Sequence, residues 1–130
     1  MRFSTMIAIV GFSAVACAAH AKPIRPLLDA ICEVETKGGL ITRDGNHGQA
    51  KGPYQIKREY WKDAGVRGRY LQVRDKKYAE KVMLSYWKKY APQALKHGDY
   101  QTLARIHNGG PTGHKKASTA KYWSRVRKHL

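Results

Sequence analysis

The chain has 130 residues, with 25 lysines and arginines against nine aspartates and glutamates, which gives a formal net charge of +16. This length allows one small domain, and 42% hydrophobic residues with 10% aromatics exclude a disordered basic tail. The charge favours a polyanionic partner, such as nucleic acid, an anionic cell envelope or a membrane surface, without choosing among them.

Residues 1–21 have the pattern of a secretory signal peptide. An apolar run follows Arg2 and ends at Ala19-His20-Ala21, which matches an A-x-A cleavage site. The run is shorter than the roughly 20 residues that span a bilayer, and no later segment is apolar enough to do so. We therefore expect a secreted monomer, extracellular or periplasmic, that consists of residues 22–130 and has no membrane span. This part keeps a net charge of +15 and one cysteine, Cys32, so it can form no internal disulfide.

The first predicted helix spans residues 26–36, with apolar residues at helical spacing after Pro26 and with Gly38-Gly39 beyond its end. Residues 40–52 are rich in turn formers, so we expect a short irregular hairpin or a long loop, with 40–42 as one strand and 53–56 as the return strand. A short helix is predicted over 58–64, closed by Gly65.

Three more helices are predicted in the second half of the chain. Asp75 is a suitable N-cap for a helix that runs to about Tyr90, and Pro92 is expected to end it. Asp99 caps the next helix, which ends at 108–111, and the last helix begins at about Ser118. Because the chain has no repeats or linkers, residues 22–130 are predicted to form one mostly α-helical domain of the α+β class, with a minor β element.

One acidic residue of the first helix lies on its apolar face. At 100° per residue, Glu35 lies about 40° from Ile31, whereas Glu33 lies about 200° away and should contact water. Burial and the partial negative charge of the helix end both disfavour an ionised carboxyl, so both raise its pKa and suit Glu35 to donate a proton near neutral pH. The alternative is that the helix frays before Glu35, whose side chain then reaches water or pairs with a basic residue.

A second acid, Asp44, follows nine residues later in the turn-rich segment. Two carboxylates in unequal environments, one buried and one ionised, are what glycoside hydrolysis requires. Asp44 can equally be a structural turn former in Asp44-Gly45-Asn46.

Several motifs resemble the invertebrate-type (destabilase-like) lysozymes in order and spacing, over nearly the whole of residues 22–130. They are Ile31-Cys32-Glu33-Val34-Glu35, Gly52-Pro53-Tyr54-Gln55-Ile56-Lys57, Tyr60-Trp61-Lys62-Asp63, Ala104-Arg105-Ile106-His107-Asn108-Gly109-Gly110-Pro111, the run 115–119 and Tyr122-Trp123. The His-Asn-Gly-Gly-Pro run with the downstream Tyr-Trp is specific to that group, whereas lytic transglycosylases carry patterns related to Gly-Pro-Tyr-Gln-Ile-Lys.

The resemblance implies a lysozyme-like α+β fold and hydrolysis of the β-1,4 bond between N-acetylmuramic acid and N-acetylglucosamine in peptidoglycan. By position, Glu35 matches the family's general acid and Asp44 its nucleophile, in a retaining mechanism. The positions that match the lining of the sugar cleft are Lys57, Tyr60, Trp61, Tyr86, His107, Asn108 and Gly109. From helical phase, Tyr86 is also explained as a packing residue.

The chain departs from the family pattern in two ways. It lacks the family's dense disulfides, so nothing covalent holds the segment around Asp44, and the spacing from Glu35 to Asp44 is short. In addition, the isopeptidase activity credited to some members rests on a serine. The residues before Gly52, Gln49-Ala50-Lys51, include none, so we do not expect that activity.

Two other functions fit the same residues. A lytic transglycosylase needs only Glu35, and a non-catalytic cationic protein could bind the cell envelope through its charge alone. The spread of basic residues does not indicate specific nucleic-acid recognition, so the expected partner is peptidoglycan in the anionic bacterial cell wall. His107 and His114 have no third ligand at useful spacing, so we expect no metal and no cofactor.

Overall fold

The computed structural model describes residues 22–130, and the predicted signal peptide lies outside them. The helices are α1 (Arg25–Thr36), α2 (Arg58–Ala64), α3 (Lys76–Tyr90), α4 (Pro92–His97), α5 (Tyr100–Gly109) and α6 (Ala120–Arg127). Short 3-10 helices are η1 (Tyr70–Arg74), η2 (Gly113–Lys115) and η3 (Ala117–Thr119). Strands β1 (Ala50–Lys51) and β2 (Ile56–Lys57) pair antiparallel, with Ala50 opposite Lys57 and Lys51 opposite Ile56.

Local capping signals explain where the main helices begin and end. The Asp75 carboxylate accepts a hydrogen bond from the Tyr78 amide at 2.8 Å, and Asp99 does the same for the Thr102 amide at 3.2 Å. Gly65 closes α2 in a left-handed conformation, as predicted. The predicted helices over 26–36, 58–64 and 76–90 and the helix after Asp99 are therefore confirmed.

The predicted hairpin was wrong in its strands. Residues 40–42 form no strand and the return strand is 56–57, because the antiparallel pair is the tighter one between 50–51 and 56–57. The helix over 76–90 ends before Pro92, as predicted, and Pro92 then begins a further short helix, α4. It occupies the first turn of α4, where its missing amide hydrogen costs nothing. The last helix begins at Ala120, after the separate turn η3.

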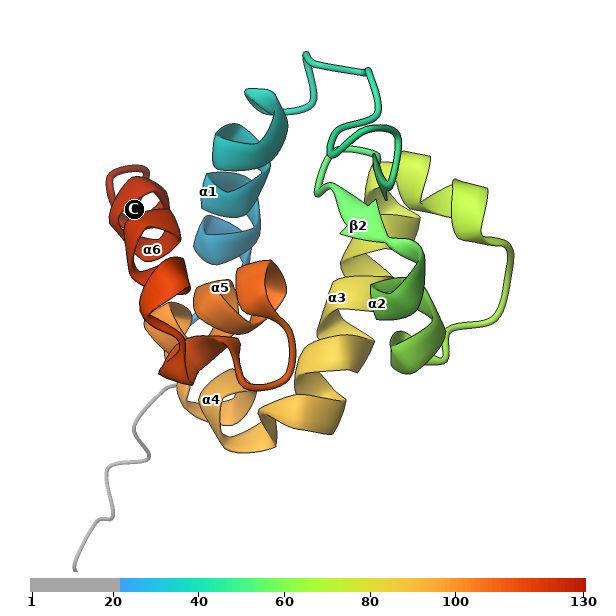
Figure 1. Cartoon of the computed structure of the whole chain (residues 1–130). Coiled ribbons are helices and arrows are strands. Elements are labelled where there is room, and N and C mark those ends of the chain that lie inside the picture. Colours follow the sequence, from blue (N-terminus) through green and yellow to red (C-terminus); the bar gives the residue numbers. More distant parts are fainter. Residues whose placement is uncertain (1–21) are drawn as a thin grey trace, which may run out of the picture.

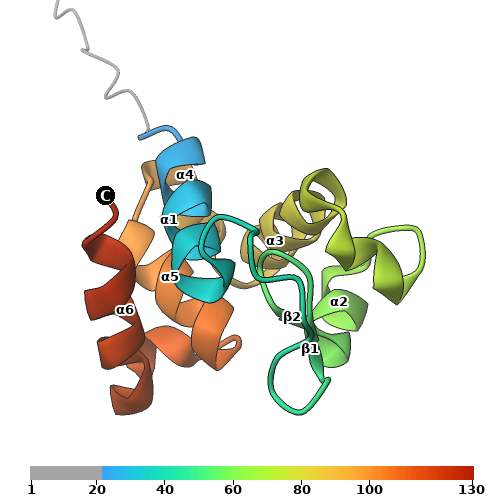
Figure 2. The ribbon, with the colours of Figure 1, turned by 90° about the horizontal axis from the view of Figure 1, so that it is seen from above.

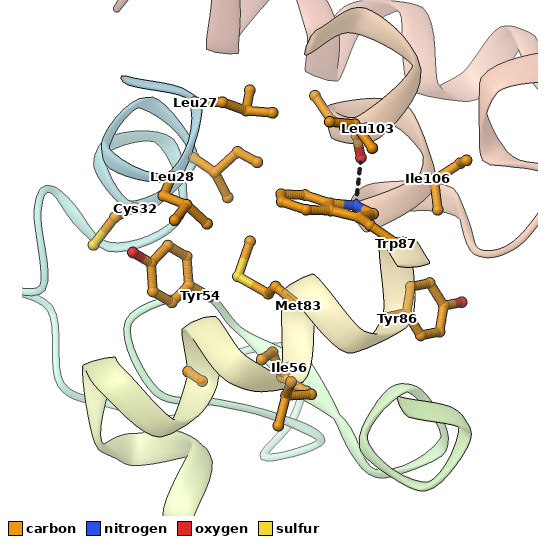
Figure 3. Close-up of a cluster of buried hydrophobic side chains, with 14 of the residues drawn as sticks. Leu27, Leu28, Cys32, Tyr54, Ile56, Met83, Tyr86, Trp87, Leu103 and Ile106 are labelled. Carbon is orange, nitrogen blue, oxygen red and sulfur yellow. Dashed lines mark hydrogen bonds between the residues drawn. The ribbon is translucent and has the colours of Figure 1, made fainter. Parts of the chain in front are cut away.

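The core forms where α1, α3 and α5 meet. Trp87 on α3 is completely buried between leucines of α1 and residues of α5, and its indole N–H donates to the Leu103 carbonyl at 3.0 Å (Figure 3). Leu28 and Met83 are 1% and 0% exposed in the same cluster. This packing supplies the stability that a chain without disulfides must obtain from buried apolar surface.

The helices form two groups, and a cavity lies between residues of both. Helices α1, α5 and α6 pack together on one side, α2 and the β-hairpin lie on the other, and α3 lies between the two groups (Figures 1 and 2). The hydroxyl of Thr36, the last residue of α1, donates to the Pro53 carbonyl at 2.7 Å and ties the helix to the hairpin turn. The C-terminal end of α1 therefore faces the cavity, and this end carries Glu35.

Candidate active site

The cavity between the two groups of helices has a volume of about 670 Å³. One wall consists of Glu35, the α5 end and the loop that follows it, and the opposite wall consists of the hairpin and α2. The lining residues are Glu35, Asn46, Ala50, Gln55, Lys57, Glu59, Tyr60, Asp63, Tyr86, His107, Asn108, Gly109, Gly110, Pro111, Lys116, Ser118 and Thr119. An open cavity of this size, lined by polar side chains together with tyrosine rings, suits a ligand such as a sugar chain, which has both hydroxyl groups and apolar ring faces.

Glu35 is one of three acidic residues in the cavity lining, beside Glu59 and Asp63. Its side chain is 19% exposed, and its Oε1 accepts a hydrogen bond from the Tyr122 hydroxyl at 2.9 Å. Burial raises the pKa of Glu35 to about 7, against the lowering effects of the Tyr122 hydrogen bond and the positive charge of Arg125. The predicted orientation toward the interior is confirmed, and fraying of the helix is not observed. Glu35 can hold a proton at neutral pH in contact with the cavity.

His107 lies beside Glu35 and is 7% exposed. Its Nε2 is 3.0 Å from the Tyr54 carbonyl oxygen and 3.9 Å from Glu35 Oε1, and its Nδ1 is 3.1 Å from the Tyr60 hydroxyl. Burial lowers the pKa of His107 to about 4, so the imidazole is neutral at pH 7. The predicted lining position of His107 is observed, although little of the ring faces the cavity.

Asp44 lies apart from the cavity lining and is bound to two cations. Its carboxylate is 2.6 Å from Lys51 Nζ and 3.1 Å from a guanidinium nitrogen of Arg74. The hydrogen bond from Lys51, together with Arg74, lowers the pKa of Asp44, so this carboxylate is ionised at neutral pH. The two ion pairs and the bridge between Gly45 and Ala50 hold a segment that has no disulfide.

Five of the other predicted cleft residues line the cavity, and Trp61 does not. Lys57, Tyr60, Tyr86, Asn108 and Gly109 line the cavity, as the resemblance implies. Tyr60 and Tyr86 stack with ring centroids 3.8 Å apart, so Tyr86 both packs and contributes to the wall.

Trp61 does not line the cavity. Its indole N–H donates to the Tyr78 hydroxyl at 2.9 Å, and its ring packs against Tyr70. Neighbouring residues of a helix point about 100° apart, and on α2 this rotation turns Tyr60 toward the cavity and Trp61 toward Tyr78 and Tyr70. The run Tyr60-Trp61 itself did not indicate which ring would face the cavity.

Sequence reasoning missed several contributors. Tyr122 appears in the Tyr122-Trp123 motif without an assigned role, yet its hydroxyl donates to Glu35 from 87 positions away in the chain. Gln55, Glu59 and Asp63 also line the cavity, although Gln55 and Asp63 lie within motifs of the resemblance that assigned them no role. A buried tyrosine needs a partner for its hydroxyl, and that requirement was the one available hint for Tyr122.

Within residues 22–130, no group of three or more histidine, cysteine, aspartate or glutamate side chains is arranged to hold a metal ion. In the same part of the chain, no helix combines the length and apolar character needed to cross a membrane.

Comparisons with known proteins agree with this geometry. The Destabilase family model matches residues 25–129. A lysozyme from Ostrea edulis is 34% identical over 104 residues, covering 77% of this chain and 76% of the relative, and one from Magallana gigas is 36% identical over 77 residues, covering 58% and 56%. The crystal structure of Tapes japonica lysozyme superposes with a TM-score of 0.67 at 28% identity, covering 84% of this chain and 94% of that one.

The family match spans almost all described residues, and the fold agrees with that of a solved lysozyme over nearly its full length. The lysozyme-like α+β fold implied by the sequence motifs is confirmed. The chain belongs to the destabilase family, the invertebrate-type lysozymes, which are glycoside hydrolases.

Proposed function

We propose that the chain is a muramidase that cleaves the β-1,4 bond between N-acetylmuramic acid and N-acetylglucosamine in peptidoglycan, with Glu35 as general acid. The observation that carries this proposal is a carboxyl group with a pKa of about 7 in the wall of an open cavity of about 670 Å³. A group with this pKa is half protonated at neutral pH, so it can donate a proton and later take one back.

In the first step, Glu35 donates its proton to the glycosidic oxygen as the bond to the anomeric carbon breaks, and the leaving sugar departs with a free hydroxyl. We propose that Asp44 then bonds to the anomeric carbon. Glu35, now ionised, takes a proton from water, which displaces Asp44 with overall retention. The lowered pKa of Asp44 supports its role as an ionised nucleophile.

A lytic transglycosylase is the second candidate, and the position of Asp44 favours it. Asp44 is bound to Lys51 and Arg74 and is absent from the cavity lining, which leaves Glu35 as the carboxyl group beside His107. In that reaction a hydroxyl of the substrate attacks the anomeric carbon in place of Asp44 and gives an anhydro product. The two routes share Glu35 and differ in the need for Asp44.

We also propose that the protein acts outside the cell that makes it, as a bacteriolytic enzyme. The signal-peptide pattern of residues 1–21 and the net charge of +15 on the remainder support this location, because a cationic protein is attracted to anionic cell walls.

The test is mass spectrometry of the fragments released from purified peptidoglycan by the wild type, Glu35→Gln and Asp44→Asn. The control is Glu33→Gln, which alters an exposed carboxylate two positions away on the same helix. We expect hydrated reducing ends from the wild type and the control, and no fragments from Glu35→Gln.

The Asp44→Asn variant separates the two enzymatic routes. Loss of nearly all activity supports hydrolysis through Asp44. Retained activity with products that are lighter by one water establishes the transglycosylase instead. If Glu35→Gln still lyses cells, the protein acts as a cationic binder and the enzymatic proposal is rejected.

A further inference from the structure

The two ring nitrogens of His107 are both occupied by neighbours other than Glu35. A carbonyl oxygen can only accept, so Nε2 carries the hydrogen and donates it to the Tyr54 carbonyl at 3.0 Å. In a neutral ring Nδ1 then has a lone pair, and it accepts from the Tyr60 hydroxyl at 3.1 Å. Glu35 Oε1 is 3.9 Å from Nε2, which is too far for a hydrogen bond.

From this geometry, and resting on the proposed role of Glu35, we propose that His107 is a positioning residue. Locked as the neutral Nε2–H tautomer between the Tyr54 carbonyl and the Tyr60 hydroxyl, it closes the wall beside Glu35 without donating a hydrogen bond to that carboxyl. Its function is to exclude water from Glu35, and it takes no part in proton transfer or sugar binding.

The Tyr54 carbonyl, which accepts from His107 Nε2, is held in place by contacts outside the cavity. The Tyr54 side chain is completely buried, and its hydroxyl donates to Glu80 at 2.7 Å. Two nitrogens of the Arg25 guanidinium also bind Glu80, each at 2.7 Å. With the hydrogen bond from Thr36 to the Pro53 carbonyl, these contacts fix the backbone that receives the imidazole hydrogen.

The imidazole of His107 has to be neutral for Glu35 to keep its raised pKa. The groups that face this carboxyl are Tyr122 and Arg125 on α6, Tyr60 on α2 and His107 on α5. The Tyr122 hydroxyl and Arg125 already lower the pKa of Glu35. An imidazolium 3.9 Å away would lower it further and ionise the general acid at neutral pH. His107 is buried among the rings of Tyr60, Trp87 and Tyr122, and the loss of water around the imidazole disfavours that cation.

The first test measures the tautomer directly in the wild-type protein. Nitrogen-15 NMR of histidine-labelled protein distinguishes the Nε2–H tautomer, the Nδ1–H tautomer and the cation, and the His107 signal is the one absent from His107→Gln. We expect His107 to remain the neutral Nε2–H tautomer from pH 8 to about pH 5, because burial lowers its pKa to about 4. The Nδ1–H tautomer, or protonation of His107 above pH 6, would overturn the proposal.

The second test uses the pH profile of kcat/KM on a soluble peptidoglycan oligosaccharide. His107→Gln keeps a side-chain N–H for the Tyr54 carbonyl, so its alkaline limb should stay near pH 7. His107→Ala opens a space for water beside Glu35, so the limb should move about one pH unit lower, with about a fivefold loss of kcat/KM at pH 7. His97→Gln, an exposed histidine on α4, is the matched control and should behave as the wild type.

These outcomes separate the inference from the proposed function. An unchanged alkaline limb in His107→Ala, or an equal displacement in His107→Gln, rejects the positioning role even when Glu35 is essential. If Glu35→Gln retains activity, the proposed function fails, while the NMR measurement still tests the state of His107. If His107→Ala does not fold, the tautomer in the wild type and the profile of His107→Gln decide the question.

Discussion

Burial of Glu35 has a consequence for stability that can be measured without any substrate. The unfolded chain releases this proton near pH 4.5, whereas the folded protein holds it up to about pH 7. Between these values the folded state binds more protons than the unfolded state, so the free energy of unfolding falls as the pH rises. From these two pKa values, we expect Glu35 to cost the folded protein about 2.5 kcal/mol more at pH 8 than at pH 5.

The Glu35→Gln variant removes the ionisation and keeps the shape of the side chain. The quantity to compare is the free energy of unfolding of the variant minus that of the wild type. We expect this difference to become more positive by about 2.5 kcal/mol from pH 5 to pH 8, measured by urea denaturation at both pH values. Glu33→Gln, on the exposed side of the same helix, should show almost no such change. Because burial lowers the pKa of His107 to about 4, its imidazole stays neutral in the folded wild type between pH 5 and pH 8.

A difference between Glu35→Gln and the wild type that does not change with pH would refute this reasoning. It would mean that Glu35 titrates equally in the folded and unfolded states, and the raised pKa would be lost as a basis for catalysis. An equal change in Glu33→Gln would show that general charge repulsion is responsible, since removing any carboxylate from a chain with a net charge of +15 alters that repulsion.

Three other predictions concern the hydrogen bond to Glu35, a glycine of the hairpin and the net charge of the protein. Tyr122→Phe removes a hydrogen bond that favours the ionised carboxyl of Glu35, so kcat/KM at pH 8 should rise about three- to fivefold, and a fall would contradict the assignment. Gly52→Ala, with a φ of +78° and a new Cβ that would clash with the Val73 carbonyl, should lower the free energy of unfolding by at least about 2 kcal/mol in urea denaturation. Gly48→Ala, equally left-handed but with open space, should cost about 1 kcal/mol, and equal costs would exclude the clash as the cause. Raising the salt concentration should slow lysis of whole cells more than cleavage of an uncharged oligosaccharide, and equal effects would reject electrostatic attraction to the wall.

The ion pairs of Asp44 show how the protein compensates for the missing disulfides. Lys51 lies on β1 and Arg74 ends η1, so the two cations connect the turn that carries Asp44 to two different elements. These partners are seven and 30 positions away from Asp44 in the chain. The sequence indicated that no disulfide would hold this turn. Which cations form ion pairs with Asp44 instead depends on how η1 packs against the hairpin.

Local patterns were sufficient for the main helices and for the burial of Glu35. Helical periodicity and capping residues act over three or four positions, so Asp75, Asp99 and Gly65 marked their helix boundaries in the sequence alone. The same periodicity turned Glu35 toward the interior. The partners of that carboxyl could not be read in this way, because Tyr122 and His107 reach it only when α5 and α6 pack against α1. Which side chains meet across a cavity is set by the packing of elements distant in the chain, and periodicity within one helix holds no information about that packing.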